Sequence, residues 1–150
     1  LAEAEFLRFG SIHRNSYVNA PAALSSHLSL RDAPQLMFAG QITGVEGYTE
    51  SSATGLLAGI NLSRQLNGND PVVPPPATMM GALYRYMREA DPKHFQPMNA
   101  NFGLLDDLEG VTPKVLKDKA KKRELFAERA LTAMAAWRDA SGIIPTALHG

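Results

Sequence analysis

The stretch Leu36-Met-Phe-Ala-Gly-Gln-Ile-Thr-Gly-Val-Glu-Gly-Tyr48, continued by Thr49-Glu-Ser-Ser-Ala-Thr-Gly-Leu-Leu-Ala-Gly-Ile-Asn61, decides how this chain folds. It starts as a short apolar run, passes through Gly40, Gly44 and Gly47, and then carries small residues. This order predicts a strand, a glycine turn and a helix N-terminus, where backbone N–H groups can approach an anionic cofactor. Glycine at such a junction also serves packing alone, so the pattern leaves both interpretations open.

The expected helix carries a stripe of small residues, because Ser51, Gly55 and Gly59 follow one another at intervals of four. Residues at this spacing share one helix face. The stripe favours close packing against a sheet, above all at Gly59.

Two further blocks are rich in hydrogen-bonding side chains and lack helical or strand periodicity. They are Arg8-Phe-Gly-Ser-Ile-His-Arg-Asn-Ser-Tyr-Val-Asn-Ala-Pro21 and Phe95-Gln-Pro-Met-Asn-Ala-Asn-Phe-Gly-Leu-Leu105. Imidazole can stack on a heteroaromatic ring, guanidinium pairs with carboxylates, and a carboxamide both donates and accepts. Taken alone, the first block also fits a solvated loop, and the asparagines of the second also fit turn caps.

Together with Phe38–Tyr48, these blocks resemble the folate- and FAD-dependent tRNA (uracil-5-)-methyltransferases, in the family's order and at similar spacing. The resemblance covers roughly residues 1 to 135. It implies FAD contacts along the glycine turn, at Gly40, Gln41, Ile42, Thr43, Gly44, Val45, Glu46, Gly47 and Tyr48. It implies a folate site formed by His13, Arg14, Asn15, Asn99, Asn101 and Phe102, with His13 as the ring-stacking residue and the two loops converging on one pocket.

The resemblance also implies the fold class, which is α/β. The chain is expected to be the closing part of a Rossmann-like FAD-binding domain and incomplete on its own. Residues 1–76 would form the C-terminal segment of that domain, and residues 77–150 a helical extension. No G-x-G-x-x-G occurs here, so the phosphate loop for the ADP half of FAD would lie in a missing N-terminal part of the same protein.

Local patterns place the elements. We expect short strands at 24–30 and 35–39, the second buried, separated by a turn at Arg31-Asp-Ala-Pro34. We expect helices at 50–66 and 78–90, with a loop from 91 to 110. Thr112 followed by Pro113 predicts an N-cap and a first helical residue, opening a third helix that runs to about Ala140.

Bulk composition excludes several classes of site. The 150 residues have zero formal charge and contain no cysteine, so a disulfide scaffold, a cysteine–zinc site and a cysteine nucleophile are excluded within this chain. We expect no metal site and no membrane span, and a cytoplasmic protein. The chain begins with Leu, which we interpret as a piece of a longer protein.

A basic cluster opens the third helix. Residues 114 to 123 include six cationic side chains and one carboxylate, Asp118. Such a cluster can bind tRNA phosphates, and a solvated helix face explains it equally well. The residues expected at tRNA are Lys117, Lys121, Lys122 and Arg123.

The resemblance implies that the full-length protein methylates C5 of a T-loop uridine in tRNA. Methylenetetrahydrofolate would supply the carbon, reduced FAD would carry it, and NAD(P)H would serve as the reductant. The family's catalytic cysteines lie outside this chain, so we expect no catalytic residue here and no activity of the isolated chain. Two alternatives remain: a fragment of an FAD-dependent enzyme that modifies the tRNA wobble uridine, and a non-catalytic tRNA-binding module derived from a flavoprotein.

Overall fold

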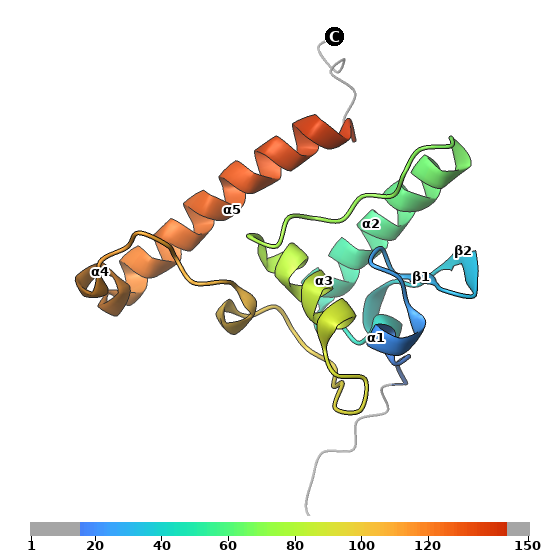
Figure 1. Ribbon diagram of the computed structural model, residues 1–150, viewed down its shortest axis with the longest axis horizontal. Helices are drawn as coiled ribbons and strands as arrows, with labels where there is room; N and C mark the ends of the chain where they lie inside the picture. Colours follow the sequence, from blue (N-terminus) through green and yellow to red (C-terminus); the bar gives the residue numbers. More distant parts are fainter. Residues whose placement is uncertain (1–15, 144–150) are drawn as a thin grey trace, which may run out of the picture.

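The described part of the molecule is mostly helical, with one small antiparallel hairpin (Figure 1). The computed structural model describes residues 16–143, without the side chains of 113 and 114. In chain order the elements are α1 (Ala20–Ala23), β1 (Ser29–Leu30), β2 (Ala33–Met37), η1 (Gly40–Thr43), α2 (Tyr48–Leu66), α3 (Met79–Glu89), η2 (Phe102–Leu104), α4 (Pro113–Lys117) and α5 (Lys119–Ser141).

The strand expected at 24–30 is wrong over most of its length. Only Ser29–Leu30 forms β1, which pairs antiparallel with β2, and Leu28 has a left-handed φ of 65°. The Oγ of Ser25 accepts hydrogen bonds from the backbone N–H groups of His27 (3.4 Å) and Ser29 (3.2 Å). Such local side-chain bonds compete with strand pairing, and here they bend the chain into a turn.

The strand expected at 35–39 lies at 33–37 instead and is not buried. The side chains of Pro34, Gln35 and Leu36 are exposed. The sequence predicts a core strand here, whereas in the structure the segment forms the exposed second strand of the hairpin.

The two central helices confirm their prediction to within two residues. Helix α2 starts after Gly47, which has a φ of 109°, and ends at Asn67. Helix α3 starts after Thr78, whose Oγ1 accepts from the Gly81 N–H at 3.0 Å. This N-cap removes one of the unpaired amides that every helix start exposes.

The core lies between α2, α3 and the segment that leads from α1 to the glycine turn. Its fully buried side chains include Leu24, Val45, Leu57, Leu83 and Met87. Buried Asn61 also attaches the proline-rich connection to α2 through two hydrogen bonds. Its Nδ2 donates to the Val72 carbonyl (2.9 Å), and its Oδ1 accepts from the Val72 N–H (2.7 Å).

The single helix expected from Thr112 to Ala140 is interrupted at Asp118. Helix α4 ends at Lys117, and the backbone of Asp118 is extended, with φ −80° and ψ 104°. The Oδ1 of Asp118 accepts from the N–H groups of Ala120 (3.0 Å) and Lys121 (3.1 Å), so it caps a new helix, α5. The Thr112 side chain makes no capping hydrogen bond, and Gly142 ends α5 in the left-handed conformation, as its sequence position predicts.

Candidate functional site

The glycine turn is a short 3-10 turn fixed to the helix that follows it. Gly40 and Gly44 have φ angles of 73° and 90°, where residues with a side chain are strained. The Gly40 N–H donates to the buried Thr54 Oγ1 at 2.8 Å, and this hydroxyl donates back to the carbonyls of Glu50 and Ser51 at 3.0 Å. Thr54 therefore holds the start of the turn against α2, a role that the sequence analysis missed.

Two of the three glycines are explained by the chain itself. A Cβ on Gly44 would lie 2.5 Å from Cζ of Phe95, and a Cβ on Gly47 would lie 2.2 Å from Oε2 of Glu50. At Gly44 the small size therefore leaves room for the Phe95 ring. At Gly47 the contact is with the end of a flexible side chain, and the φ of 109° is what favours glycine.

The outer edge of the turn fits a ligand with hydrogen-bond acceptors. Gln41, Glu46 and Tyr48 are exposed, and the Tyr48 side chain is 95% accessible. The first amide of α2 with an acceptor is that of Ser51, which donates to the Gly47 carbonyl at 3.0 Å. The amides before it in the helix have no intrahelical acceptor and carry the positive end of the helix dipole, which suits the anionic and carbonyl groups of a flavin nucleotide.

The structure brings the 95–105 block directly against this turn. Val45 and Met98 form a parallel bridge, in which the Glu46 N–H donates to the Met98 carbonyl and the Met98 N–H donates to the Gly44 carbonyl, both at 2.9 Å. Two residues further on, the Ala100 N–H donates to Oε1 of Glu50 at 3.0 Å. The segments expected to contact FAD and folate are therefore neighbours.

The side chains of the two asparagines of this block differ in whether their hydrogen-bonding groups remain available to a ligand. The Oδ1 of Asn101 accepts from the Gly103 N–H and its Nδ2 donates to the Asn99 carbonyl, both at 3.0 Å, so Asn101 caps η2 and shapes the loop. Asn99 is exposed and makes no side-chain hydrogen bond within residues 16–143. Of the two carboxamides, that of Asn99 is the freer for a ligand.

His13, Arg14 and Asn15 lie outside the described residues. The chain that follows them reaches the same site, because the Val18 N–H donates to the Ile42 carbonyl at 2.8 Å. The Tyr17 ring packs edge-on against Phe95, with centroids 5.9 Å apart. Phe95, which also covers Gly44, thus contacts both the glycine turn and the end of the first block.

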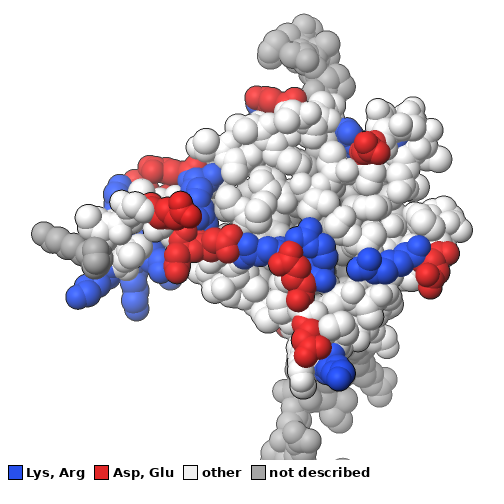
Figure 2. Space-filling view, viewed as in Figure 1, with Lys and Arg blue, Asp and Glu red and all other residues white. Residues whose placement is uncertain are grey.

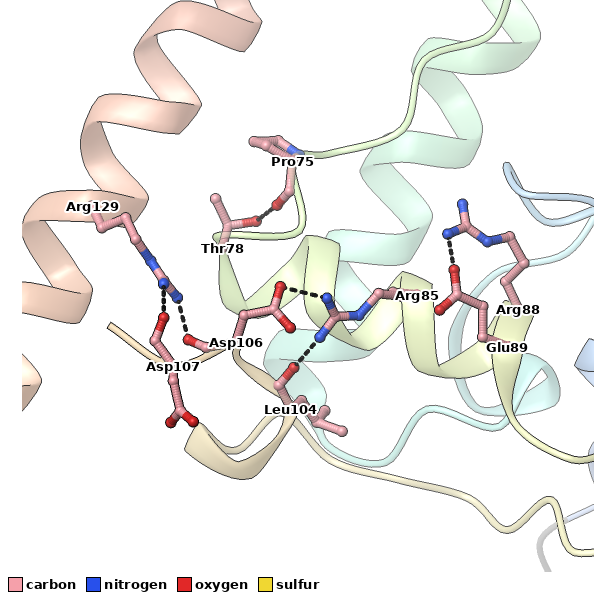
Figure 3. Close-up of polar contacts among 9 residues, drawn as sticks. All are labelled: Pro75, Thr78, Arg85, Arg88, Glu89, Leu104, Asp106, Asp107 and Arg129. Atoms are coloured by element: carbon pink, nitrogen blue, oxygen red, sulfur yellow. Dashed lines mark hydrogen bonds and ion pairs between the residues drawn. The ribbon is translucent and has the colours of Figure 1, made fainter. Parts of the chain in front are cut away.

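Beyond η2, two arginines fasten the chain between α3 and α5 (Figure 3). Arg85 donates to Oδ2 of Asp106 (2.6 Å) and to the Leu104 carbonyl (2.7 Å), while Arg129 donates to the carbonyls of Asp106 (3.0 Å) and Asp107 (3.1 Å). The hydrogen bond from Arg85 lowers the pKa of the Asp106 carboxyl below its ordinary value. The end of the loop is thus fixed from two sides.

The basic residues gather where α4 meets α5, with acidic side chains among them (Figure 2). Lys117 and Arg123 are exposed, Lys122 is half-buried with its Nζ 5.7 Å from the Phe126 ring centre, and Lys121 pairs with Glu124 at 2.6 Å. The first turn of α5 contains no acidic residue. Cations at a helix N-terminus oppose the helix dipole. The capping carboxylate of Asp118 offsets part of that repulsion, and an anionic ligand would offset more of it.

The basic end of α5 is connected to the 95–105 block through Phe102. The rings of Phe102 and Phe126 pack with centroids 5.6 Å apart, and the Arg123 guanidinium carbon lies 5.8 Å from the Phe102 ring centre. The three regions singled out from the sequence are therefore contiguous wherever the structure describes them.

The glycine stripe of α2 faces open space in this chain. A Cβ on Gly55 or Gly59 would meet nothing within 4 Å. These glycines line a groove with Ser63 and Arg64, and Arg64 donates to the Ser141 carbonyl at the end of α5 at 2.7 Å. Close packing of the stripe on a sheet remains a prediction for a longer protein.

Residues 16–143 show neither a membrane-spanning helix nor a cluster of metal-ligating side chains. None of the helices there combines the length and apolarity needed to cross a bilayer. The same residues contain no group of three or more His, Asp or Glu side chains arranged to hold a metal ion.

Comparison with known proteins agrees with the resemblance. Residues 1–70 match the family model described as Glucose inhibited division protein A, GIDA. The chain is 52% identical over 138 residues, 91% of its length, to the Methylenetetrahydrofolate--tRNA-(uracil-5-)-methyltransferase TrmFO of Pelobacter propionicus. It is 51% identical over 87% of its length to the TrmFO of Natranaerobius thermophilus. The same share of the chain is 52% identical to the TrmFO of Streptococcus agalactiae.

The chain is homologous to one region of the TrmFO proteins and matches the GIDA model over residues 1–70, which confirms the expected resemblance. It spans 29% of the length of the Pelobacter relative and 32% of the Natranaerobius relative. It therefore corresponds to one region of these proteins.

Proposed function

We propose that this chain is the C-terminal region of a flavoprotein that methylates C5 of a T-loop uridine in tRNA. The observation that carries the proposal is the 52% identity over 91% of the chain to a protein whose name states folate-dependent tRNA (uracil-5-) methylation. A match of this extent includes the 95–105 block, whereas the GIDA model stops at residue 70. This favours the methyltransferase over the wobble-uridine enzyme.

In the full-length protein, the hairpin and α2 would complete a Rossmann-like FAD domain whose other strands come from the missing N-terminal part. FAD would lie along Gly40–Tyr48, with the unpaired amides of the α2 start aimed at its polar groups. When bound, the reduced flavin supplies the one-carbon carrier chemistry and the reducing equivalents, which derive from NAD(P)H. The residues of this chain bind and orient it.

Methylenetetrahydrofolate would bind beside the flavin, between the 95–105 block and the loop that carries His13, Arg14 and Asn15. Asn99 would hydrogen-bond the pterin edge, Phe102 would contribute an apolar wall, and Asn101 would act chiefly through the loop shape. The bridge between Val45 and Met98 supports this placement, since it fixes the two segments side by side.

The junction of α4 and α5 would contact tRNA through Lys117, Lys121, Lys122 and Arg123. Catalytic cysteines would come from the rest of the protein, because this chain contains none. We propose a cytoplasmic enzyme, as its tRNA substrate requires.

The decisive experiment is methyl transfer by the full-length protein to a tRNA transcript, with methylenetetrahydrofolate and NAD(P)H. We expect 5-methyluridine in the T-loop and FAD in the purified protein. The isolated chain should bind FAD weakly and transfer nothing. Modification at the wobble position would indicate the sister enzyme, and sub-micromolar FAD or tRNA binding by the isolated chain without transfer by the full-length protein would indicate a binding module.

A further inference from the structure

The Glu50 side chain has defined contacts at the start of α2. One carboxylate oxygen, Oε1, accepts a hydrogen bond from the Ala100 N–H at 3.0 Å. The other lies against Gly47, where a Cβ would approach it to 2.2 Å. The side chain is thus held between the N-cap of the helix and the loop 50 residues further along the chain.

The loop has few other attachments to the glycine turn. The bridge with Val45 ends at Met98, and the arginine contact on the far side begins at Leu104. Between them, the Asn101 side chain contacts only its own segment: Gly103, the Asn99 carbonyl and, through a weak hydrogen bond of 3.6 Å, the Met98 sulfur. Within residues 16–143, the Glu50 carboxylate makes the one hydrogen bond that ties residues 99–103 to another element.

We infer that Glu50 is a positioning residue for the folate loop: it fixes the peptide between Asn99 and Asn101 against the flavin-binding helix and so sets folate affinity. The inference rests on the proposed function. The property of Glu50 that matters is the length of its side chain, which brings an acceptor to the Ala100 N–H, and not its charge. An acceptor at the same distance should therefore serve, and a shorter carboxylate should not.

The test uses full-length protein loaded with FAD and titrated with tetrahydrofolate, with flavin fluorescence as the readout. Glu50→Ala should weaken folate binding roughly fivefold to tenfold, the effect of one lost hydrogen bond of ordinary strength. Glu50→Gln keeps an oxygen acceptor at the same reach and should restore affinity to near wild type. Glu50→Asp keeps the charge but is one methylene shorter, so it should resemble Glu50→Ala.

FAD content and melting temperature separate positioning from a general loss of structure. Both should stay near wild type in Glu50→Gln and Glu50→Asp, and in the control Ser52→Ala, an exposed position of the same helix. If Glu50→Ala fails to fold, the comparison of Gln with Asp decides. Equal folate affinity for Asp and wild type, or a parallel loss of FAD and folate, overturns the inference. Wild-type protein that holds FAD but binds no folate instead overturns the proposed function.

Discussion

The ring of Phe95 lies where a side chain on residue 44 would have to be, with its Cζ 2.5 Å from the Cβ position of Gly44. Phe95, the first residue of the expected folate block, can therefore occupy its position only because residue 44 in the expected cofactor segment is glycine. Gly44 also has a φ of 90°, so two separate penalties meet at this position.

We expect Gly44→Ala to destabilise the chain by about 2–4 kcal/mol, because left-handed backbone strain adds to an overpacked contact. Gly68→Ala is the matched control, since Gly68 has a φ of 72° and open space around its Cβ position. Chemical denaturation of both variants measures the difference. Equal losses would show that Phe95 yields freely and that backbone strain alone requires glycine.

The open stripe on α2 predicts effects of opposite sign in two contexts. In the isolated chain, Gly55→Ala and Gly59→Ala meet no neighbour and should stabilise α2, each by up to about 1 kcal/mol of helix propensity. In the full-length protein the same changes should lower the melting temperature if the missing sheet packs on this face. Stabilisation in both contexts would show that the stripe is solvent-exposed there as well.

His27 should make the hairpin region sensitive to mild acid. Partial burial lowers the pKa of its imidazole below 6.5, and Nε2 lies 3.1 Å from the Ser29 Oγ. The folded state therefore prefers the neutral ring, so this contribution to stability is present above pH 6.5 and is lost as the pH falls below it. Thermal unfolding at pH 7.5 and 5.5 should show a smaller decrease for His27→Gln than for wild type. Equal decreases for the two proteins would contradict this role of His27.

The basic residues at the junction of α4 and α5 should act through their charge. Replacing Lys117, Lys121 and Lys122 with Gln should weaken tRNA binding by the full-length protein and reduce the salt slope by roughly one unit per lost phosphate contact. Flavin spectra should not change. Lys93→Gln, in an exposed loop, is the control. Binding and slope equal to wild type would leave this cluster as a solvated surface.

Helices whose ends are set locally were predictable from the sequence. Gly47 and Asn67 bound α2, and the Thr78 hydroxyl caps α3, so both helices begin and end at residues with local turn or capping chemistry, within two residues of the expected bounds. The same reasoning failed at Asp118, because Asp is a strong N-cap that was counted only as a charge within a basic run.

The site was only partly predictable, because its decisive contacts join distant parts of the chain. The Val45–Met98 bridge and the Glu50–Ala100 hydrogen bond leave no periodic pattern in the sequence. Glu50 lies in the first turn of α2, where an acidic residue is favoured by the helix dipole alone, so its type gives no sign of a contact with a distant loop. The resemblance singled out three segments, and the structure shows by which contacts two of them are adjacent, while their ligand roles stay predictions.

The paired hydrogen bonds between Asn61 and Val72 have a consequence for how this chain can vary. The carboxamide pairs with a peptide unit as a neighbouring strand would, so it fixes which residue of the proline-rich connection faces α2. Aspartate has the same shape but lacks the N–H group that the Val72 carbonyl needs. Insertions should therefore be rejected between Val72 and the start of α3. They should cost less in the exposed turn at 67–70, where the loss is limited to the hydrogen bonds that join Arg64 to Asn69 and Asp70.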